Sequence, residues 1–209
     1  MLRLRVQGRE AYGPLSGLRG RDERPSAQRS RLDRGRGLSG HHHRENLSME
    51  KDTVAYMDHK EKAVAYYKQK FNCAQGIFAA YAVEHGVEEA LALRLGTNFG
   101  GGARKGELCG AVSGALMVLG LLYGHSERGD AAAKARAYTL AEEYMNRFIR
   151  ENGSAVCREL LGYDLSVPEQ MASIREKELF RVLCPEIIRS AVAILDELLA
   201  EQDSKENGK

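Results

Sequence analysis

The chain has 209 residues, of which 43% are hydrophobic and 29% are charged, with a net charge of +2. This balance supports the core of one globular domain plus additional segments, and it excludes a chain too polar to fold. Four cysteines in this length exclude a disulfide-rich scaffold. Because no two of them form a CxxC pair, the thioredoxin pattern and the usual zinc-ribbon spacing are also excluded.

Residues 1–48 form an arm that differs from the rest of the chain in charge. The arm contains 11 Arg, no Lys and five acidic residues, a net charge of +6, so the remaining residues carry −4. Its seven Gly and its lack of apolar periodicity are typical of disordered sequence, and we expect no nucleic-acid binding. An alternative interpretation is that Met49 is the true start and the arm is upstream sequence. The arm lacks the apolar stretch of a secretory signal, which favours a cytoplasmic protein.

Capping residues and glycines predict a single helical domain over residues 49–203, followed by a frayed tail at 204–209. The predicted helices span residues 52–70, 72–86, 87–96, 108–123, 130–153, 154–162 and 185–201. A further predicted helix begins at a capping box of Ser166 and Glu169, with Pro168 in its first turn. No segment shows the alternation of a strand. The predicted fold class is therefore all-α, a compact bundle of about six to eight helices.

The longest uncharged segment, residues 108–126, contains four glycines. A glycine-rich run that barely reaches the length of a membrane span is better explained as a buried core helix, so we expect no membrane span. Within it, Gly110 and Gly114 lie one helical turn apart. Because Gly inside a helix costs about 1 kcal/mol relative to Ala, this pair predicts that something approaches the helix backbone closely. The approaching group is either a neighbouring helix or a cluster or ligand.

The four cysteines share a predicted position. Cys73, Cys109, Cys157 and Cys184 are each expected in the first turn of a helix. Free N–H groups and the positive end of the helix dipole favour a thiolate there and can lower the pKa of a cysteine by about one unit or more. This placement predicts reactive or ligating thiolates. The alternative is that all four are small buried hydrophobic residues without chemistry.

The segments around the cysteines resemble the C_GCAxxG_C_C family. They are "NCAQ" at Cys73, "FGGG…CGAVSGALMVLGLLYG" at Cys109, "GSAVCRELLG" at Cys157 and "LCPEII" at Cys184. The family is named for four cysteines and a C-G-A-x-x-G motif, here residues 109–114. The resemblance implies a redox-active protein, and a related domain in split-Soret cytochrome c accompanies an iron–sulfur centre and haems. The chain has no CxxCH, so no covalent c-type haem is implied.

Two redox interpretations remain open. In the first, the four thiolates ligate an iron–sulfur cluster; in the second, they form exchangeable disulfides, with Cys73 and Cys109 as the first pair to consider. The predicted metal-binding or catalytic residues are Cys73, Cys109, Cys157 and Cys184, and the predicted cofactor-binding residues are Gly100, Gly101, Gly102, Arg104 and Gly110. The glycines would bring backbone N–H groups to the sulfurs, and Arg104 would offset negative charge. An alternative role for Arg104 and Lys105 is to bind a substrate anion.

Two interpretations without redox chemistry also stay open. In the first, the four thiolates bind a structural zinc ion, although such sites usually draw their ligands in close pairs. In the second, the protein is a metal-free helical interaction module with buried, unreactive thiols. The sequence does not identify a redox partner, and it is compatible with a homodimer. His59 and His85 are expected on solvated helix faces and His125 in a turn.

Overall fold

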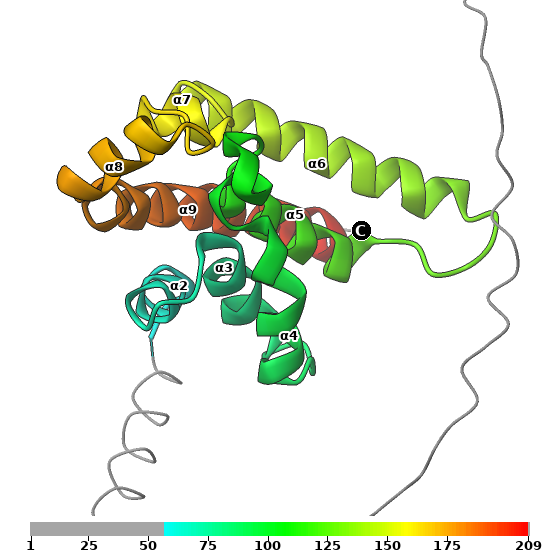
Figure 1. The fold of residues 1–209 in the computed structure, drawn as a ribbon. Coiled ribbons are helices and arrows are strands. Elements are labelled where there is room, and N and C mark those ends of the chain that lie inside the picture. Colours follow the sequence, from blue (N-terminus) through cyan, green and yellow to red (C-terminus); the bar gives the residue numbers. More distant parts are fainter. Residues whose placement is uncertain (1–56, 209) are drawn as a thin grey trace, which may run out of the picture. The chain divides into compact units, whose positions relative to one another are not determined.

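The computed structural model describes residues 57–208, and Figure 1 shows their arrangement. The predictions for the arm, for Met49 and for a helix start at Asp52 lie outside these residues. The α-helices within them are α2 (His59–Lys68), α3 (Cys73–Ala82), α4 (Glu89–Gly96), α5 (Gly110–Tyr123), α6 (Ala131–Asn152), α7 (Cys157–Leu161), α8 (Pro168–Glu176) and α9 (Leu179–Asn207). Between α4 and α5 lie a 3-10 turn, η1 (Thr97–Phe99), and a wide turn, η2 (Gly102–Gly106).

The all-α prediction is confirmed. Within residues 57–208 there are eight α-helices and no strand, and β-pairing is limited to one isolated antiparallel bridge between Leu108 and Val156. In the same part of the chain, no helix combines the length and the apolar character needed to cross a membrane.

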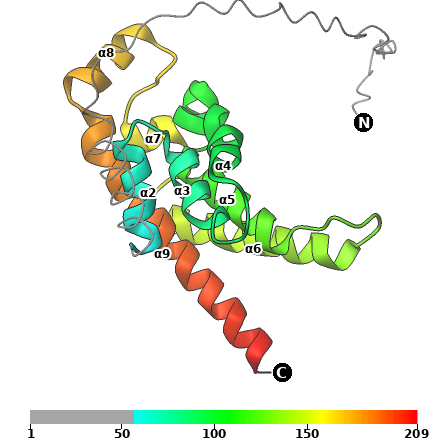
Figure 2. The ribbon, with the colours of Figure 1, turned by 90° about the horizontal axis from the view of Figure 1, so that it is seen from below.

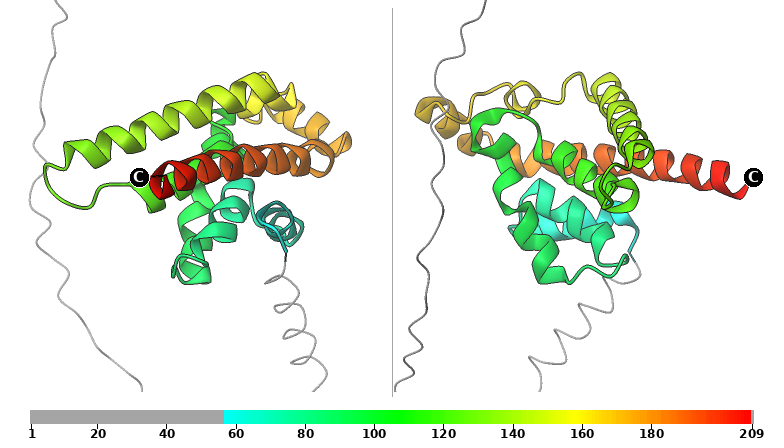
Figure 3. Two further views of the ribbon diagram at one scale, coloured as in Figure 1. Left: turned by 180° about the vertical axis from the view of Figure 1, so that it is seen from behind. Right: turned by 90° about the vertical axis from the view of Figure 1, so that its right-hand side faces the viewer.

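Helix α9 runs through the bundle between two groups of helices. Figures 1 and 3 show α6 on one side of α9, and α2 and α3 on the other. Helix α3 packs against α2, α4 and α5, and α5 packs in turn against α6 and α9. Figure 2 shows the N-terminal part of α6 and the C-terminal part of α9 extending beyond the packed region. The core therefore lies where α2, α3, α5 and α9 meet the C-terminal half of α6.

Periodic apolar positions on α6 and α9 build much of this core. On α6, Leu140, Tyr144 and Phe148 are buried at steps of four residues, as the sequence pattern predicts. The Tyr144 hydroxyl satisfies its hydrogen-bonding need by donating to the Ala191 carbonyl at 3.1 Å. Each fully buried apolar side chain contributes about 1.5–3 kcal/mol, so this interface fixes the position of α9.

Glycines bring α3 unusually close to both of its neighbours. A Cβ added at Gly76 of α3 would lie 2.6 Å from the Ala63 carbonyl oxygen of α2. On the other side, a Cβ at Gly114 of α5 would lie 2.9 Å from the Ala74 carbonyl oxygen. The close approach predicted at the glycine pair of α5 is therefore made by a neighbouring helix, α3, and at Gly110 also by the Cys73 sulfur, at 2.6 Å from an added Cβ.

Several helix boundaries are correct because local capping determines them. The Asn72 side chain caps α3 and forms a capping box with Gln75, the Asp130 side chain caps α6, and Gly153 ends α6 in the left-handed conformation. Pro168 is the first residue of α8, as predicted, but the cap is Val167, because the Ser166 hydroxyl donates to Asp164 instead of forming a capping box.

Other boundaries differ from the prediction. Helix α2 begins at His59 because the Asp58 side chain caps it, accepting from the Glu61 N–H at 2.8 Å. Helix α3 ends at Ala82, four residues before Gly86. Helix α5 begins at Gly110, and α9 begins at Leu179, with Pro185 inside it. Helix α9 also continues to Asn207, through most of the segment for which fraying is predicted.

Candidate thiol site

All four cysteines line one cavity of about 630 Å³. Cys73 is the first residue of α3, Cys109 is the N-cap of α5, Cys157 is the first residue of α7, and Cys184 lies in α9. The first three thiols are buried, with 5–8% of their surface exposed, and Cys184 is half-buried. The structure therefore brings together residues that are separated by up to 111 positions in the sequence.

Asn72 fixes the start of α3 and attaches to it the end of α4 and the segment that follows, residues 97–106, which we call the glycine loop. Its side chain accepts from the Gln75 N–H at 3.0 Å and donates to the Thr97 carbonyl at 2.8 Å and the Gly96 carbonyl at 3.3 Å. A Cβ at Gly100 would lie 2.7 Å from the Asn72 side chain, so only glycine allows the loop to pass this close. One asparagine thus positions Cys73 against the loop that leads to Cys109.

Cys109 and Cys157 are brought together by the bridge between Leu108 and Val156. The Cys109 N–H donates to the Ala155 carbonyl at 2.8 Å, and the Cys157 N–H donates to the Glu107 carbonyl at 2.7 Å. These two bonds hold the N-terminal ends of α5 and α7 side by side. An ion pair between Glu107 and Arg158 reinforces the contact from the surface.

The three buried thiols line the same cavity and influence one another. The Cys109 thiol raises the pKa of Cys73, and the Cys157 thiol raises the pKa of Cys109, so Cys109 is a neighbour of both. On the α9 side, the Tyr67 hydroxyl donates to the Phe180 carbonyl at 2.9 Å, and Tyr67 lines the cavity together with Cys184. Tyr67 therefore links α2 to α9 at the cavity, a role that the sequence does not indicate.

The loop between α4 and α5 has an unusual backbone. Gly101, Gly102, Ala103 and Arg104 are consecutive residues with φ between +52° and +64°, and the Glu107 N–H closes the turn on the Gly102 carbonyl at 3.2 Å. Left-handed backbone costs about 1–2 kcal/mol for a residue with a Cβ, so Ala103 and Arg104 store strain beside the cavity. Gly101 of this loop lines the cavity beside Cys73.

The pKa values of Cys73, Cys109 and Cys184 are raised, contrary to the prediction from helix N-termini. The neighbouring Cys109 thiol and then burial raise the pKa of Cys73 well above its ordinary value. The neighbouring Cys157 thiol is the largest cause that raises the pKa of Cys109 to about 12. Burial raises the pKa of Cys184 to about 12. Desolvation and neighbouring thiols outweigh the backbone N–H groups of Gly101 and Ala111, which favour the thiolates of Cys73 and Cys109.

The prediction that all four cysteines occupy a first helical turn is wrong for Cys184. Cys184 is the sixth residue of α9, because the helix begins before Pro185. Leu179, Phe180 and Leu183 pack against the core, and this burial outweighs the preference of proline for a helix start.

The cavity lining carries positive charge and no carboxylate. Its cations are Lys68, Lys70, Arg104 and Arg181, and its aromatic residues are Tyr67, Phe71 and Phe180. Of the residues predicted to bind a cofactor, Gly100, Gly101 and Arg104 line the cavity, whereas Gly102 and Gly110 do not. Gly102 packs against the Glu107 backbone, and Gly110 against the Cys73 sulfur. Lys105, considered with Arg104 as an anion ligand, is exposed and also outside the lining.

Sequence reasoning missed Lys68, Lys70 and Arg181 as lining residues. The sequence signal for the two lysines is their closeness to Cys73: Lys68, the last residue of α2, lies five residues before it, and Lys70 lies three residues before it. Within residues 57–208, no three His, Cys, Asp or Glu side chains are grouped closely enough to hold one metal ion.

The family model described as "Putative redox-active protein (C_GCAxxG_C_C)" matches residues 71–198, which include all four cysteines and most of the cavity lining. The chain belongs to this family. Comparison with curated proteins gives no match, and neither does comparison with solved structures.

Proposed function

We propose that this C_GCAxxG_C_C protein is an electron-transfer protein that holds an iron–sulfur cluster on the thiolates of Cys73, Cys109, Cys157 and Cys184. The observation that carries the proposal is that four thiols from four helices line one cavity that has four cations and no carboxylate in its wall. Four thiolates are the usual ligand set of two-iron and four-iron clusters. When bound, such a cluster supplies one-electron chemistry.

The residues around the thiols suit such a group. The backbone N–H groups of Gly101 and Ala111 favour the thiolates of Cys73 and Cys109, and hydrogen bonds to sulfur are a principal means of tuning a cluster's potential. Arg104, which lines the cavity, would offset the negative charge of four thiolates.

A structural zinc ion is supported less well by the arrangement of the thiols. A tetrahedral ion requires all of its sulfurs at about 2.3 Å from one point. Within residues 57–208 the side chains are not grouped in this way, whereas a cluster carries its own sulfides and bridges more widely spaced ligands.

The test is an absorption spectrum and iron and sulfide analysis of protein purified without oxygen. Broad visible absorption with stoichiometric iron is expected, and each single Cys→Ser variant should lose most of the iron. The control is Ser113→Ala, because Ser113 is buried one turn from Cys109 but lies outside the cavity lining. Iron-free, colourless protein under these conditions would contradict the proposal.

A second candidate function, dithiol–disulfide exchange, is supported by the placement of Cys73, Cys109 and Cys157 in one cavity wall, where Cys109 is a neighbour of the other two. Oxidation of Cys109 with either neighbour would release two protons and pass two electrons to an external disulfide, which would be reduced to two thiols. The raised pKa values of Cys73 and Cys109 make both weak nucleophiles near neutral pH, so this candidate ranks second. A thiol count that falls by two on mild oxidation of metal-free protein, with one intramolecular disulfide in a peptide map, would favour it.

A further inference from the structure

The cavity at the thiols has the size and lining of a small-molecule site. Ligand pockets typically enclose about 300–1,000 Å³ and combine apolar walls with a few polar groups, and this cavity encloses about 630 Å³. The thiols occupy one part of its wall. Much of the remainder is apolar, with the aromatic rings of Phe71 and Phe180 among Leu160, Leu161 and Ile187.

Three of the four cations in the lining have no ion-pair partner among residues 57–208. Arg181 pairs with Glu178, whereas Lys68, Lys70 and Arg104 are exposed and form no ion pair with a described residue. Since no carboxylate contributes to the wall, their charges add rather than cancel. Such a group of cations raises the local concentration of anions and can bind an anionic group by charge-assisted hydrogen bonds.

Two of these cations stand on strained backbone. Lys70 has φ +76° in the turn between α2 and α3, and Arg104 has φ +64° in the glycine loop. Glycine would adopt either conformation at lower cost, so each long cationic side chain is present despite a local penalty of about 1–2 kcal/mol. Strain of this kind is concentrated at binding and catalytic sites.

We propose that the cavity binds a small organic anion, with an apolar or aromatic body against Phe71 and Phe180 and a carboxylate, phosphate or sulfonate group at Lys68, Lys70 and Arg104. The inference rests on the proposed function only in that both use the same cavity. It assigns the site a substrate class, and it places that substrate next to the thiols.

The test compares two fluorescent probes with the same aromatic skeleton, one anionic and one neutral. 1-Anilinonaphthalene-8-sulfonate carries the anion, and N-phenyl-1-naphthylamine lacks it. The anionic probe should bind more tightly, at one site per chain, and its affinity should fall with rising salt. On metal-free protein it should also protect Cys184, which is half-buried, from a neutral maleimide.

Charge-removing variants then locate the anionic group. Lys70→Gln and Arg104→Gln should each weaken the anionic probe by up to about fivefold and leave the neutral probe unchanged, and the double variant should show both losses. Lys105→Gln is the matched control, because Lys105 is an exposed neighbour of Arg104 outside the cavity lining. All three positions are exposed, so the variants should fold, which circular dichroism checks.

The proposal is overturned if the two probes bind equally, or if Lys105→Gln weakens binding as much as Arg104→Gln. Neither result depends on iron, because the titration uses protein with and without metal. If the Cys→Ser variants lose iron but wild type shows no preference for the anionic probe, the cluster proposal is supported and the ligand proposal fails. If the anionic probe is preferred by protein that never binds iron, the ligand proposal is supported and the cluster proposal fails.

Discussion

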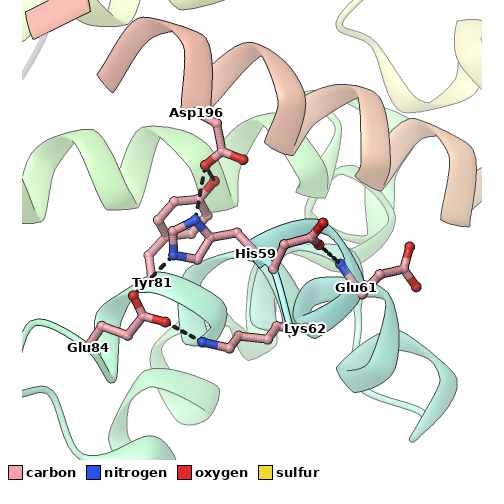
Figure 4. Close-up of polar contacts among 7 residues, drawn as sticks. His59, Glu61, Lys62, Tyr81, Glu84 and Asp196 are labelled. Carbon is pink, nitrogen blue, oxygen red and sulfur yellow. Dashed lines mark hydrogen bonds and ion pairs between the residues drawn. The ribbon is translucent and has the colours of Figure 1, made fainter. Parts of the chain in front are cut away.

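Two regions near the opposite ends of α2 differ in whether their charged side chains are paired. At the start of α2, Figure 4 shows His59 between the carboxylates of Asp196 and Glu84, with Lys62 also pairing with Glu84. The His59 ring nitrogens lie 3.0 Å from Asp196 and 3.2 Å from Glu84, and the Tyr81 hydroxyl donates to Asp196 at 2.6 Å. At the other end of α2, Lys68 and Lys70 face the thiol cavity, which has no carboxylate in its wall.

The difference separates charges that hold helices together from charges that are available to a ligand. The His59 cluster joins three helices through complementary groups, and the His59 ring stacks on Tyr81 with 3.9 Å between centroids. Each charged group in it is paired with another group of the same cluster. Of the cations at the cavity, Lys68, Lys70 and Arg104 form no ion pair with a residue in 57–208, so they remain available to an anion.

The largest expected effect is on the stability of the helix contact beside the thiol cavity. Gly110→Ala places a Cβ 2.6 Å from the Cys73 sulfur and 3.0 Å from the Phe99 carbonyl oxygen, so α5 or Cys73 must shift. We expect the free energy of unfolding to fall by about 1–3 kcal/mol and iron binding to weaken. Gly120→Ala, in the same helix but with no atom within 4 Å of the added Cβ, should instead gain up to about 1 kcal/mol. Equal effects in urea unfolding would show that Gly110 is not sterically required.

The next effect tests how the glycine loop is attached. Asn72→Ala removes the cap of α3 and the two bonds to the loop carbonyls, and we expect a loss of about 2 kcal/mol in denaturant unfolding. Asn72→Ser restores a cap but not the loop bonds, so its stability should be intermediate. A serine variant as stable as wild type would mean that the loop bonds contribute nothing.

The third effect acts on the paired end. The hydrogen bond to Asp196, followed by the contacts to Glu84, raises the pKa of His59 against the opposing effect of burial. Its stabilising effect is therefore fully present below the unfolded-state value near 6.5 and is lost as the pH rises through the folded-state pKa. We expect wild type to exceed His59→Gln in stability at pH 5.5 by about 1 kcal/mol or less, with the gap closing above pH 8.

The matched control for that measurement is His85→Gln. His85 is exposed one residue after Glu84, and its side chain has no hydrogen bond with a described residue. Its variant should follow the wild-type pH dependence. The two ends also act independently in this comparison, so His59→Gln should leave iron content unchanged; a loss of iron would show that the paired end supports the thiol site directly.

The smallest effect measures the strain stored in the loop. Ala103→Gly at φ +52° should raise stability by about 0.5–1 kcal/mol, because the relieved left-handed strain exceeds the added entropy of the unfolded chain. The same substitution at the exposed helical residue Ala132 should lower stability by about 1 kcal/mol. If both variants lose stability in urea unfolding, Ala103 is not strained.

How much of this could be predicted from sequence depended on the range of the interactions. Asn72, Asp130 and Gly153 interact with residues three or four positions away, so their capping roles can be predicted from the local sequence. Pro185 was misleading because its local preference for a helix start was outweighed by the burial of Leu179 and Phe180.

Long-range partners were not legible in the same way. His59 was expected on a solvated face, but it is half-buried against Asp196, 137 residues away. The cations of the cavity come from α2, the glycine loop and α9, and no local pattern links them. The four cysteines were identified as a set by their flanking residues, and only the fold brings them to one wall.

The contact between Gly110 and Cys73 has a mechanical consequence. The Cys73 sulfur occupies the place that a side chain at Gly110 would otherwise fill, so it helps to set the spacing of α3 and α5. We therefore expect that a bulky adduct on that sulfur would be accommodated only if Cys73 or one of the two helices shifts.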